Sequence, residues 1–400
     1  MFSNLRQLCN LIPNHLVPKL AWETGVQKQA RTYLPWSHVV TLLFAQLTHS
    51  LGLNDVCDAL NLHSGLLSAI RGATPPSRNN LSHANRERDP AMAEQLFWQM
   101  LAYLQELSPR FGVGRPRKFA FRFKRMIYLV DSTTIQLVAN SLDWAKHRRR
   151  KAAAKCHLRL NLQSFLPRFA IVDTAGHADA KRARELCAGL QDGEIVIFDK
   201  AYVDLLHLFD LFRRGIFWVT RSKEGMKFRV VRRYQWGRFG NIVRDDLVQM
   251  KSSASRRAYP VWLRRVVAWV EVDGKMRQME FLSNNLEWSA QTIVDLYRCR
   301  WGIETFFKEI KQTLQLADFL GHNANAVRWQ VWTALLTYLL LRFCAFLSQW
   351  RHSFTRLFTL LRSALWEKLQ LRSLLELYGT AGGHFRFLGT PEQPYLPGFA

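Results

Sequence analysis

The chain has 400 residues, of which 48% are hydrophobic and 12% aromatic, enough for two or three folded domains. It carries 56 Lys and Arg against 31 Asp and Glu, which gives a net charge of +25 at pH 7. The apolar content excludes an intrinsically disordered chain. The excess of cations indicates a polyanionic partner, with nucleic acid as the first candidate and an anionic membrane surface as the alternative.

The cysteines and the apolar segments bear on the compartment. The six cysteines are scattered without a C-x-x-C pair, which argues against a zinc ribbon and fits free thiols in a reducing compartment. The first residues lack the apolar core and the cleavage site of a secretion signal. The most apolar stretch, 332–350, is interrupted by Arg342, so we expect a buried helix and no membrane span. These features predict a soluble cytoplasmic protein.

Residues 1–115 are predicted to form a helical domain. Apolar periodicity indicates helices over 37–52, 54–67 and 91–107, and a short basic helix is expected within 74–90. Short helices around tight turns are typical of a helix-turn-helix DNA reader. Its candidate polar residues are Arg78, Asn79, Asn80, Asn85, Arg86 and Arg88. An ordinary helical bundle with a polar surface explains the same pattern equally well.

From residue 125 the pattern changes from helical to strand-like. Residues 108–125 are rich in Gly, Pro and cations, which is typical of a linker that also tracks phosphates. Strands and helices then alternate, which predicts an α/β domain with a mixed sheet. The predicted strands are 125–131, 157–163, 168–173, 193–199 and 216–222, and the predicted helices are 179–190 and 203–215. Further strand-like pieces over 223–285 predict a β-rich insertion.

Three of the predicted hydrophobic strands end on an acid, although acids are scarce in this chain. The residues are Asp131, Asp173 and Asp199. A carboxylate at the end of a buried strand is costly unless something neutralises it, and each alone is explained most simply as a cap on the next turn. Carboxylates that converge from separate elements instead make an oxygen-rich site for Mg²⁺ or Mn²⁺.

A helix predicted after the insertion, over 296–314, has the sequence LYRCRWGIETFFKEIKQTL. At about 100° per residue, five of its polar side chains fall within roughly 80° of one another. They are Tyr297, Arg300, Glu304, Lys308 and Lys311. This stripe is consistent with a solvated face of i,i+4 ion pairs. It is also consistent with an acid that binds a metal beside cations that bind phosphates.

Four residues of this helix match a known signature. The spacing of Tyr297, Arg300, Glu304 and Lys311 resembles the YREK signature of DDE transposases of the insertion-sequence-four family. The segments VDSTTIQL (130–137), AKCHLRLNL (154–162) and IVIFDKAYVD (195–204) resemble other segments of that family, in the same order. The resemblance implies an α/β, RNase H-like catalytic core with the β-rich insertion before the catalytic Glu helix.

The resemblance also implies a division of the chain. The catalytic core is expected over 119–320, between the helical N-terminal, DNA-binding domain of residues 1–115 and a helical C-terminal region over 322–400. Two segments depart from the family pattern. Lys200 and Ala201 stand where Arg and Gly are usual, and Asn161 stands where Asp is frequent.

The resemblance implies a catalytic triad of Asp131, Asp199 and Glu304, which binds two Mg²⁺ or Mn²⁺ ions per active site. It places Tyr297 and the signature cations against the DNA backbone near the cleaved end. The DNA-binding residues expected on this basis, together with those of the charge run 146–155, are Tyr297, Arg300, Lys311, Lys308, Arg148, Arg149, Arg150 and Lys155. Asp173 stays outside the triad, in a turn or in a supporting position.

Four tryptophans lie in or near the predicted insertion. They are Trp218, Trp236, Trp262 and Trp269. The resemblance suggests that one aromatic residue stabilises a flipped base, and packing in the local core is the alternative for most of them.

The function implied is that of a transposase. Such an enzyme cuts double-stranded DNA at the terminal inverted repeats of its own element and joins the freed 3′-hydroxyl to target DNA, with at least a dimer on the DNA. A nuclease that cuts without joining is one alternative. A transposase-derived DNA-binding protein without catalysis is another, and the intact triad argues against it.

Overall fold

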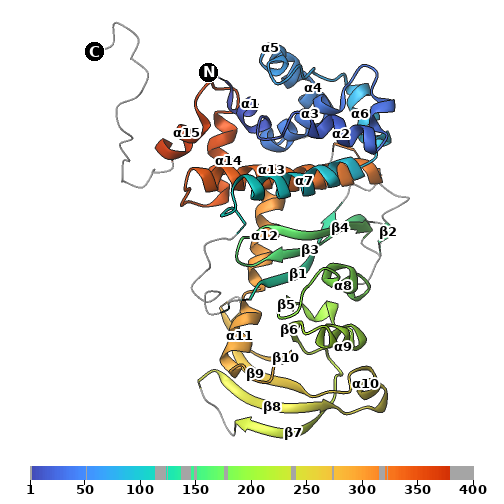
Figure 1. Ribbon diagram of the computed structural model, residues 1–400, viewed down its shortest axis with the longest axis vertical. Helices are drawn as coiled ribbons and strands as arrows, with labels where there is room; N and C mark the ends of the chain where they lie inside the picture. The colour runs from blue at the N-terminus through green and yellow to red at the C-terminus, as the bar shows by residue number, and fades with distance from the viewer. Residues whose placement is uncertain are drawn as a thin grey trace. The chain divides into compact units, whose positions relative to one another are not determined.

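The structure is a computed structural model of the whole chain, and it describes the following residues: 2–50, 52–112, 123, 125–136, 146–147, 151–174, 179–235, 240–272, 274–314, 320–321 and 323–378. The chain forms two compact units. One unit combines residues 1–111 with residues 308–400, and the other comprises residues 112–307. Figure 1 labels the elements of both. The three-part functional division drawn from the sequence stays a prediction.

The first unit is helical in its described residues. Its N-terminal part contains α1 (Asn4–Cys9), α2 (Leu16–Glu23), η1 (Val26–Gln29), α3 (Pro35–Thr48), α4 (Leu53–Leu62), α5 (Ser64–Ser68), α6 (Arg78–Glu87) and α7 (Ala91–Leu107). Its C-terminal part contains α13 (Ala324–Leu347), α14 (Phe354–Ser363) and α15 (Leu371–Tyr378). The single helix predicted over 54–67 is divided at His63, the residue between α4 and α5.

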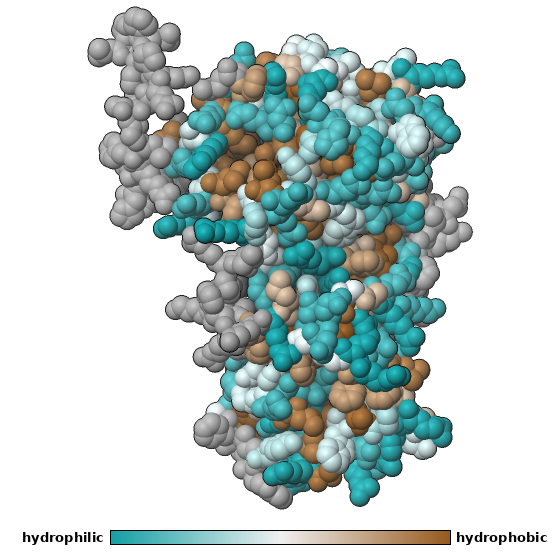
Figure 2. All heavy atoms as spheres, viewed as in Figure 1, coloured by the Kyte–Doolittle hydropathy of each residue, from teal (hydrophilic) through white to brown (hydrophobic). Residues whose placement is uncertain are grey.

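Helix α13 forms the centre of this unit, packed against α3, α6 and α7. Its apolar residues face all directions, which is the pattern of a helix surrounded by protein. By length and composition alone α13 is long and apolar enough to cross a membrane, but 78% of its most apolar 18-residue segment is buried within the protein. The buried helix expected around Arg342 is therefore present. Figure 2 shows a mostly hydrophilic surface on the face in view, with smaller hydrophobic patches.

The second unit is built on one large mixed sheet. Its strands are β1 (Ile127–Gln136), β2 (Lys146–His147), β3 (Lys151–Asn161), β4 (Pro167–Thr174), β5 (Ile195–Phe198), β6 (Phe217–Arg221), β7 (Phe228–Gln235), β8 (Ile242–Met250), β9 (Leu263–Val272) and β10 (Lys275–Ser283). Strand β1 pairs antiparallel with β3 and parallel with β5, β4 extends the sheet beyond β3, and β6 is parallel to β5. This strand order confirms the RNase H-like fold class.

The short strand β5 lies between β1 and β6 in the sheet. Its four residues, IVIF, are all buried, as in a parallel strand covered on both faces. One core cluster combines β1 and β5 with residues of α8 (Asp179–Cys187) and α9 (Leu205–Arg213), and includes Trp218 and Tyr202. The core therefore fixes the point where β5 ends beside β1.

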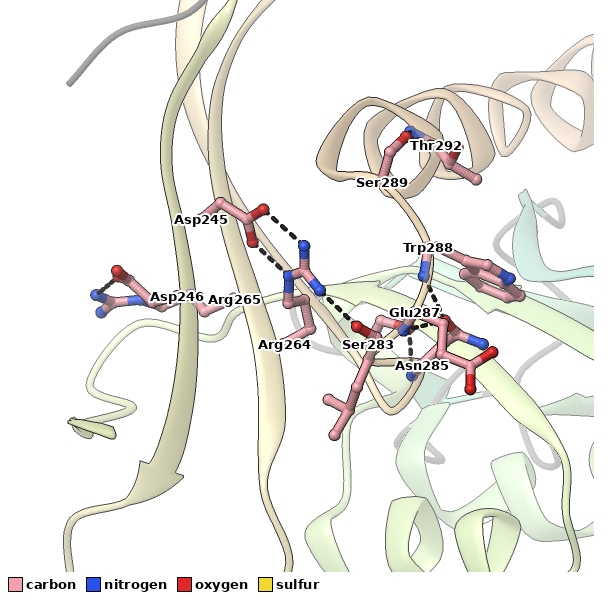
Figure 3. A network of polar contacts seen from close by, with 11 residues as sticks. Asp245, Asp246, Arg264, Arg265, Ser283, Asn285, Glu287, Trp288, Ser289 and Thr292 are labelled. Carbon is pink, nitrogen blue, oxygen red and sulfur yellow. Dashed lines mark hydrogen bonds and ion pairs between the residues drawn. The ribbon is translucent and has the colours of Figure 1, made fainter. Parts of the chain in front are cut away.

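The predicted β-rich insertion is present as the antiparallel run β7–β8–β9–β10, with a short helix α10 (Ser253–Ala258). Its strands continue the main sheet, since β10 pairs with β6. In Figure 3, Arg264 of β9 binds the carboxylate of Asp245 on β8 and donates from Nη1 to the Leu286 carbonyl at 2.7 Å. The side chain of Asn285 accepts from the Trp288 amide at 2.8 Å. These bonds fix the loop that leads into the next helix.

That helix is α11 (Ala290–Arg298), and α12 (Trp301–Thr313) follows it. The single helix predicted over 296–314 is therefore wrong at one point. The amides of Arg300, Gly302 and Ile303 each bond to a carbonyl three residues earlier, and this tighter i→i+3 pattern interrupts the α-helix at Cys299–Arg300. The angular stripe calculated for one continuous helix does not extend from Tyr297 to Glu304.

Candidate active site

Asp131 and Asp199 follow the last paired residues of two neighbouring strands. Strands β1 and β5 are parallel, and their register ends with Val130 opposite Phe198, so Asp131 and Asp199 are the next residues along each chain segment. Strand β5 ends there, whereas β1 continues to Gln136 along β3, so the strand end predicted at Asp131 is wrong. Ligand sites in α/β sheets gather at the carboxyl edge of parallel strands.

Asp131 is a largely buried carboxylate, with 17% of its side chain exposed. Its Oδ1 accepts from the Ser132 amide at 2.8 Å, and its Oδ2 accepts from Nη1 of Arg300 at 2.8 Å. The pKa of Asp131 is raised to about 6, chiefly by burial and also by the charges of Asp199 and Glu304, although Arg300 and the Ser132 amide lower it. Asp131 is thus close enough to Asp199 and to Glu304 to be repelled by both.

Asp199 is held by Tyr297 of α11. The Tyr297 hydroxyl donates to Oδ1 of Asp199 at 3.1 Å, and burial raises the pKa of this tyrosine. The ring of Tyr297 packs against Phe281 of β10, with centroids 5.0 Å apart. The insertion therefore helps to position Tyr297, and through it the carboxylate of Asp199.

Arg300 joins the first carboxylate to the helical one. Its Nη1 contacts Asp131, while its Nη2 donates to Oε1 of Glu304 at 2.5 Å. Burial alone would lower the pKa of Arg300, but its interactions with Tyr297 and with the carboxylates of Asp131 and Glu304 raise it overall. Glu304 is about half exposed, so this carboxylate has access to solvent and to a ligand.

Gly302 brings α12 close to the sheet, which the sequence analysis missed. A Cβ atom at this position would lie 3.2 Å from the ring of Phe165 and 3.4 Å from a methyl group of Leu129 on β1. Glycine thus permits the close packing that brings α12, and with it Glu304 two residues further on, against β1. A glycine inside a helix with an otherwise strong apolar stripe is the signal for such an approach.

The structure describes some, but not all, of the other residues that the sequence predicts to bind DNA. On α12, Lys308 is exposed and Lys311 is half-buried. On β3, Lys155 pairs in register with Thr134 and Asp173. The cations Arg148, Arg149 and Arg150 lie outside the described residues.

Asp173 and the departures from the family pattern have local partners. Arg182 of α8 donates from Nε to Asp173 at 3.0 Å and forms an ion pair with it. Lys200 forms an exposed ion pair with Glu224 at 3.5 Å. The side chain of Asn161 accepts from the Ser164 amide at 2.8 Å in a turn. Each of these residues therefore has a partner away from the two aspartates predicted to be catalytic.

Burial distinguishes two of the four tryptophans that were candidates for stabilising a flipped base. Trp218 is fully buried, and its indole N–H donates to the Leu208 carbonyl at 3.2 Å, so it packs the core. Trp262 is 52% exposed. Trp236 lies outside the described residues.

The carboxylates suit a hard divalent cation by their chemistry, because all their donor atoms are oxygens. Among the described residues, no group of three His, Cys, Asp or Glu side chains is gathered at metal-binding distances. The reason is visible in the contacts: the guanidinium of Arg300 lies between Asp131 and Glu304 and neutralises both. The buried Asp131 needs a cation beside it, and in this structure the guanidinium of Arg300 supplies that cation.

An RNase H-like sheet with acids at its carboxyl edge defines the class of protein, and comparison with known proteins gives the family. Residues 122–340 match the transposase DDE domain family, so the chain belongs to this family. The chain is an enzyme of DNA transposition, as the sequence predicted. A second match covers residues 3–70 and is to a domain of unknown function, DUF4372.

Individual relatives agree with this family. The y4zB protein of Sinorhizobium fredii, which carries a transposase name, is 30% identical over 303 residues, or 75% of this chain and 80% of the relative. The transposase InsG for insertion sequence element IS4 of Escherichia coli is 26% identical over 193 residues, or 46% of this chain and 42% of the relative. A piggyBac transposase solved in a synaptic complex with hairpin DNA aligns with a TM-score of 0.47 and 10% identity, over 93% of this chain and 81% of that chain.

Proposed function

We propose that Asp131, Asp199 and Glu304 form the catalytic triad of this transposase and hold two Mg²⁺ or Mn²⁺ ions. The observation that carries this proposal is the register of β1 and β5, which places two carboxylates at adjacent positions, with Glu304 linked to Asp131 through Arg300. When bound, such ions activate the attacking oxygen and stabilise the leaving oxygen in phosphoryl transfer.

The surrounding side chains have distinct tasks in this proposal. Tyr297 holds Oδ1 of Asp199 by its hydroxyl, which fixes the direction of the carboxylate. Arg300 neutralises Asp131 and Glu304 before DNA arrives, and its fork then turns to the phosphate of the bound strand. In hydrolysis, water adds to phosphorus and the 3′ oxygen of the cut strand leaves. In strand transfer, that 3′-hydroxyl adds to a target phosphate.

The DNA substrates proposed are the terminal inverted repeats of the element and a target duplex, joined in a cut-and-paste reaction. Chemistry at two ends needs two active sites, so we infer at least a dimer on DNA. The proposed contacts to the backbone come from Lys308 and Lys311 of α12, Lys155 of β3, and Arg148, Arg149 and Arg150. The protein acts where the element's DNA resides, which we take to be the cytoplasm.

The test is cleavage of DNA that carries the flanking ends of this gene, with Mg²⁺ or Mn²⁺ present. Native chain, Glu304→Gln and Glu309→Gln are compared, because both variants remove one acid from α12. Cuts at the element boundary that require metal and Glu304, but not Glu309, support the triad. Equal cleavage by all three proteins contradicts it. Specific binding without cleavage by the native chain indicates a DNA-binding protein without catalysis.

A further inference from the structure

The helical first unit contains a cavity of about 430 Å³ beside α6. Its lining comes from two neighbouring parts of that unit, the end of η1 with the turn that follows it, and one face of α6 with the residue after the helix. The lining residues are Lys28, Arg31, Thr32, Tyr33, Asn80, His83, Ala84 and Arg88. Three of these are permanent cations and none is an acid, so the cavity attracts anions.

The cavity has an exposed rim and a buried floor. Lys28, Arg31, Asn80 and His83 at the rim are exposed, whereas Tyr33 and Arg88 are buried. Asn80 and His83, three residues apart, share one face of α6. Long cationic side chains at the mouth can close over a ligand that enters from solvent, while the floor is fixed by packing.

Arg88, at the floor of the cavity, is buried and has an unused hydrogen-bond donor. It is only 2% exposed, its Nη2 donates to the Tyr33 carbonyl, and its guanidinium lies 5.2 Å from the centre of the Tyr33 ring. Its Nη1 has no hydrogen-bond partner among the described residues, and no described carboxylate forms an ion pair with it. Burial lowers the pKa of Arg88, as expected for a cation that is removed from water.

The position of Arg88 is set by its backbone. The Arg88 carbonyl accepts from the indole N–H of Trp329 at 3.0 Å, and Trp329 belongs to the buried helix α13. The guanidinium is therefore held in place before any ligand binds. A preorganised arginine with an unused donor is suited to an oxyanion, because its planar fork matches two oxygens of a phosphate.

We propose that this cavity binds a phosphate of the DNA backbone, with Arg88 at the floor and Lys28 and Arg31 at the rim. The inference rests on the DNA-binding function proposed for this chain, and it assigns that function a specific contact in the first unit. The cavity holds a phosphodiester with its sugar, and the net charge of +25 favours a polyanion over a small free anion. The contact fixes the register of α6 on the duplex without reading bases.

The test uses the full chain and duplexes with the gene's flanking ends, in which each phosphate in turn is replaced by a neutral methylphosphonate. The variant Lys28→Ala/Arg31→Ala is compared with Arg351→Ala/Lys368→Ala, which removes two exposed cations of the same unit away from the cavity. We expect the cavity variant to bind about 10–100-fold more weakly, with a salt slope that is shallower by about 1–2. The control pair should have a smaller effect.

The methylphosphonate scan gives the decisive result. At one or two adjacent phosphates, the neutral replacement should weaken binding by the native chain but not by the cavity variant, because the contact is already lost. Equal penalties in both proteins at every position overturn the proposal. Thermal stabilisation of the native chain by inorganic phosphate, with an unchanged methylphosphonate profile in the variant, also overturns it in favour of a small-anion site.

Arg88 itself is tested by Arg88→Lys, which keeps the charge and removes the fork. Methylphosphonate replacement at the same phosphate should no longer weaken DNA binding by this variant. Circular dichroism checks that the variant is folded. If Arg88→Lys does not fold, the rim variant still decides. Metal-dependent cleavage is measured separately, so a chain that binds with this phosphate profile but never cuts contradicts the triad and leaves the cavity proposal intact.

Discussion

Arg300 is bonded to Asp131 across 169 positions of sequence, with Nη1 and Oδ2 2.8 Å apart and both side chains largely buried. The same guanidinium contacts Glu304 one turn further along α12. A cation of the chain thus occupies the place between two acids where the proposed metal is needed. The proposed metal site therefore implies that metal binding and release of Arg300 are coupled.

The first prediction concerns Arg300→Gln. Without metal, the free energy of unfolding of the variant should be lower by about 2–3 kcal/mol, because Asp131 keeps its buried position without a cation. Addition of Mn²⁺ should restore more stability to the variant than to the native chain, since no arginine has to move. The measurement is the thermal midpoint with and without Mn²⁺.

Arg298→Gln is the matched control, because Arg298 is exposed and only 3.9 Å from Asp295 at the end of α11. Its midpoint should change little with or without metal. If Arg300→Gln behaves like this control, the guanidinium does not compete with metal. Binding to end DNA should also show a salt slope shallower by about 1 for Arg300→Gln alone.

The second prediction concerns Tyr297→Phe, which removes the hydroxyl that orients Asp199 and keeps the ring against Phe281. We expect half-maximal cleavage to need about 10–100-fold more metal, as is usual when the partner of a metal ligand is removed. Affinity for end DNA in the absence of metal should stay the same. A loss of DNA affinity with unchanged metal dependence would assign the hydroxyl to a phosphate instead. Tyr103→Phe, an exposed tyrosine of the first unit, is the control.

The sequence predicted that β5 ends at Asp199, because a hydrophobic strand and the residue that ends it are local features, but it was wrong at Asp131, since β1 continues to Gln136 along β3. It did not predict that Val130 and Phe198 lie opposite each other, since register between distant strands depends on the whole sheet. The resemblance placed Tyr297 against phosphate, whereas the structure shows its hydroxyl on Asp199, a contact across 98 positions. Local patterns therefore indicated which residues matter, and long-range packing decided their partners.

The helix break is the clearest error of the sequence analysis. Nothing in the segment around Cys299 is a strong helix breaker, since the glycine lies at residue 302 inside α12. The interruption follows from packing, because α11 contacts β6, β9 and β10 whereas α12 begins against Leu129 and Phe165. Packing of the two helices on different neighbours outweighs the local preference for one continuous helix.

The third prediction concerns Gly302→Leu. The leucine side chain has no space beside Phe165 and Leu129, so α12 must shift or the core must expand. We expect a loss of about 2–3 kcal/mol in the free energy of unfolding and a large loss of cleavage, because Glu304 moves with the helix. Gly65→Leu is the control, since a Cβ atom at Gly65 in α5 meets nothing within 4 Å. Equal stability of both variants would contradict the close approach of α12.

The last prediction concerns acid stability and His38, which is fully buried in α3. Its Nε2 is 2.8 Å from Oδ1 of Asn85, and its ring packs on Trp329. The pKa of His38 is lowered to about 3, chiefly by burial and also by the charge of Arg88, although the hydrogen bond to Asn85 raises it. A histidine whose pKa is lower in the folded state than in the unfolded state contributes stability that is present above about pH 6.5. That contribution is lost progressively as the pH falls towards 3.

Denaturant unfolding of the native chain is compared with His38→Gln, whose amide can still donate to Asn85. Between pH 7 and pH 5, protonation of the unfolded histidine should cost the native chain about 2 kcal/mol that the variant does not lose. His15→Gln, which removes an exposed histidine of the same unit, should keep the native pH dependence. If His38→Gln retains the full slope, another group causes the loss of stability in acid, and the buried neutral imidazole is not the source.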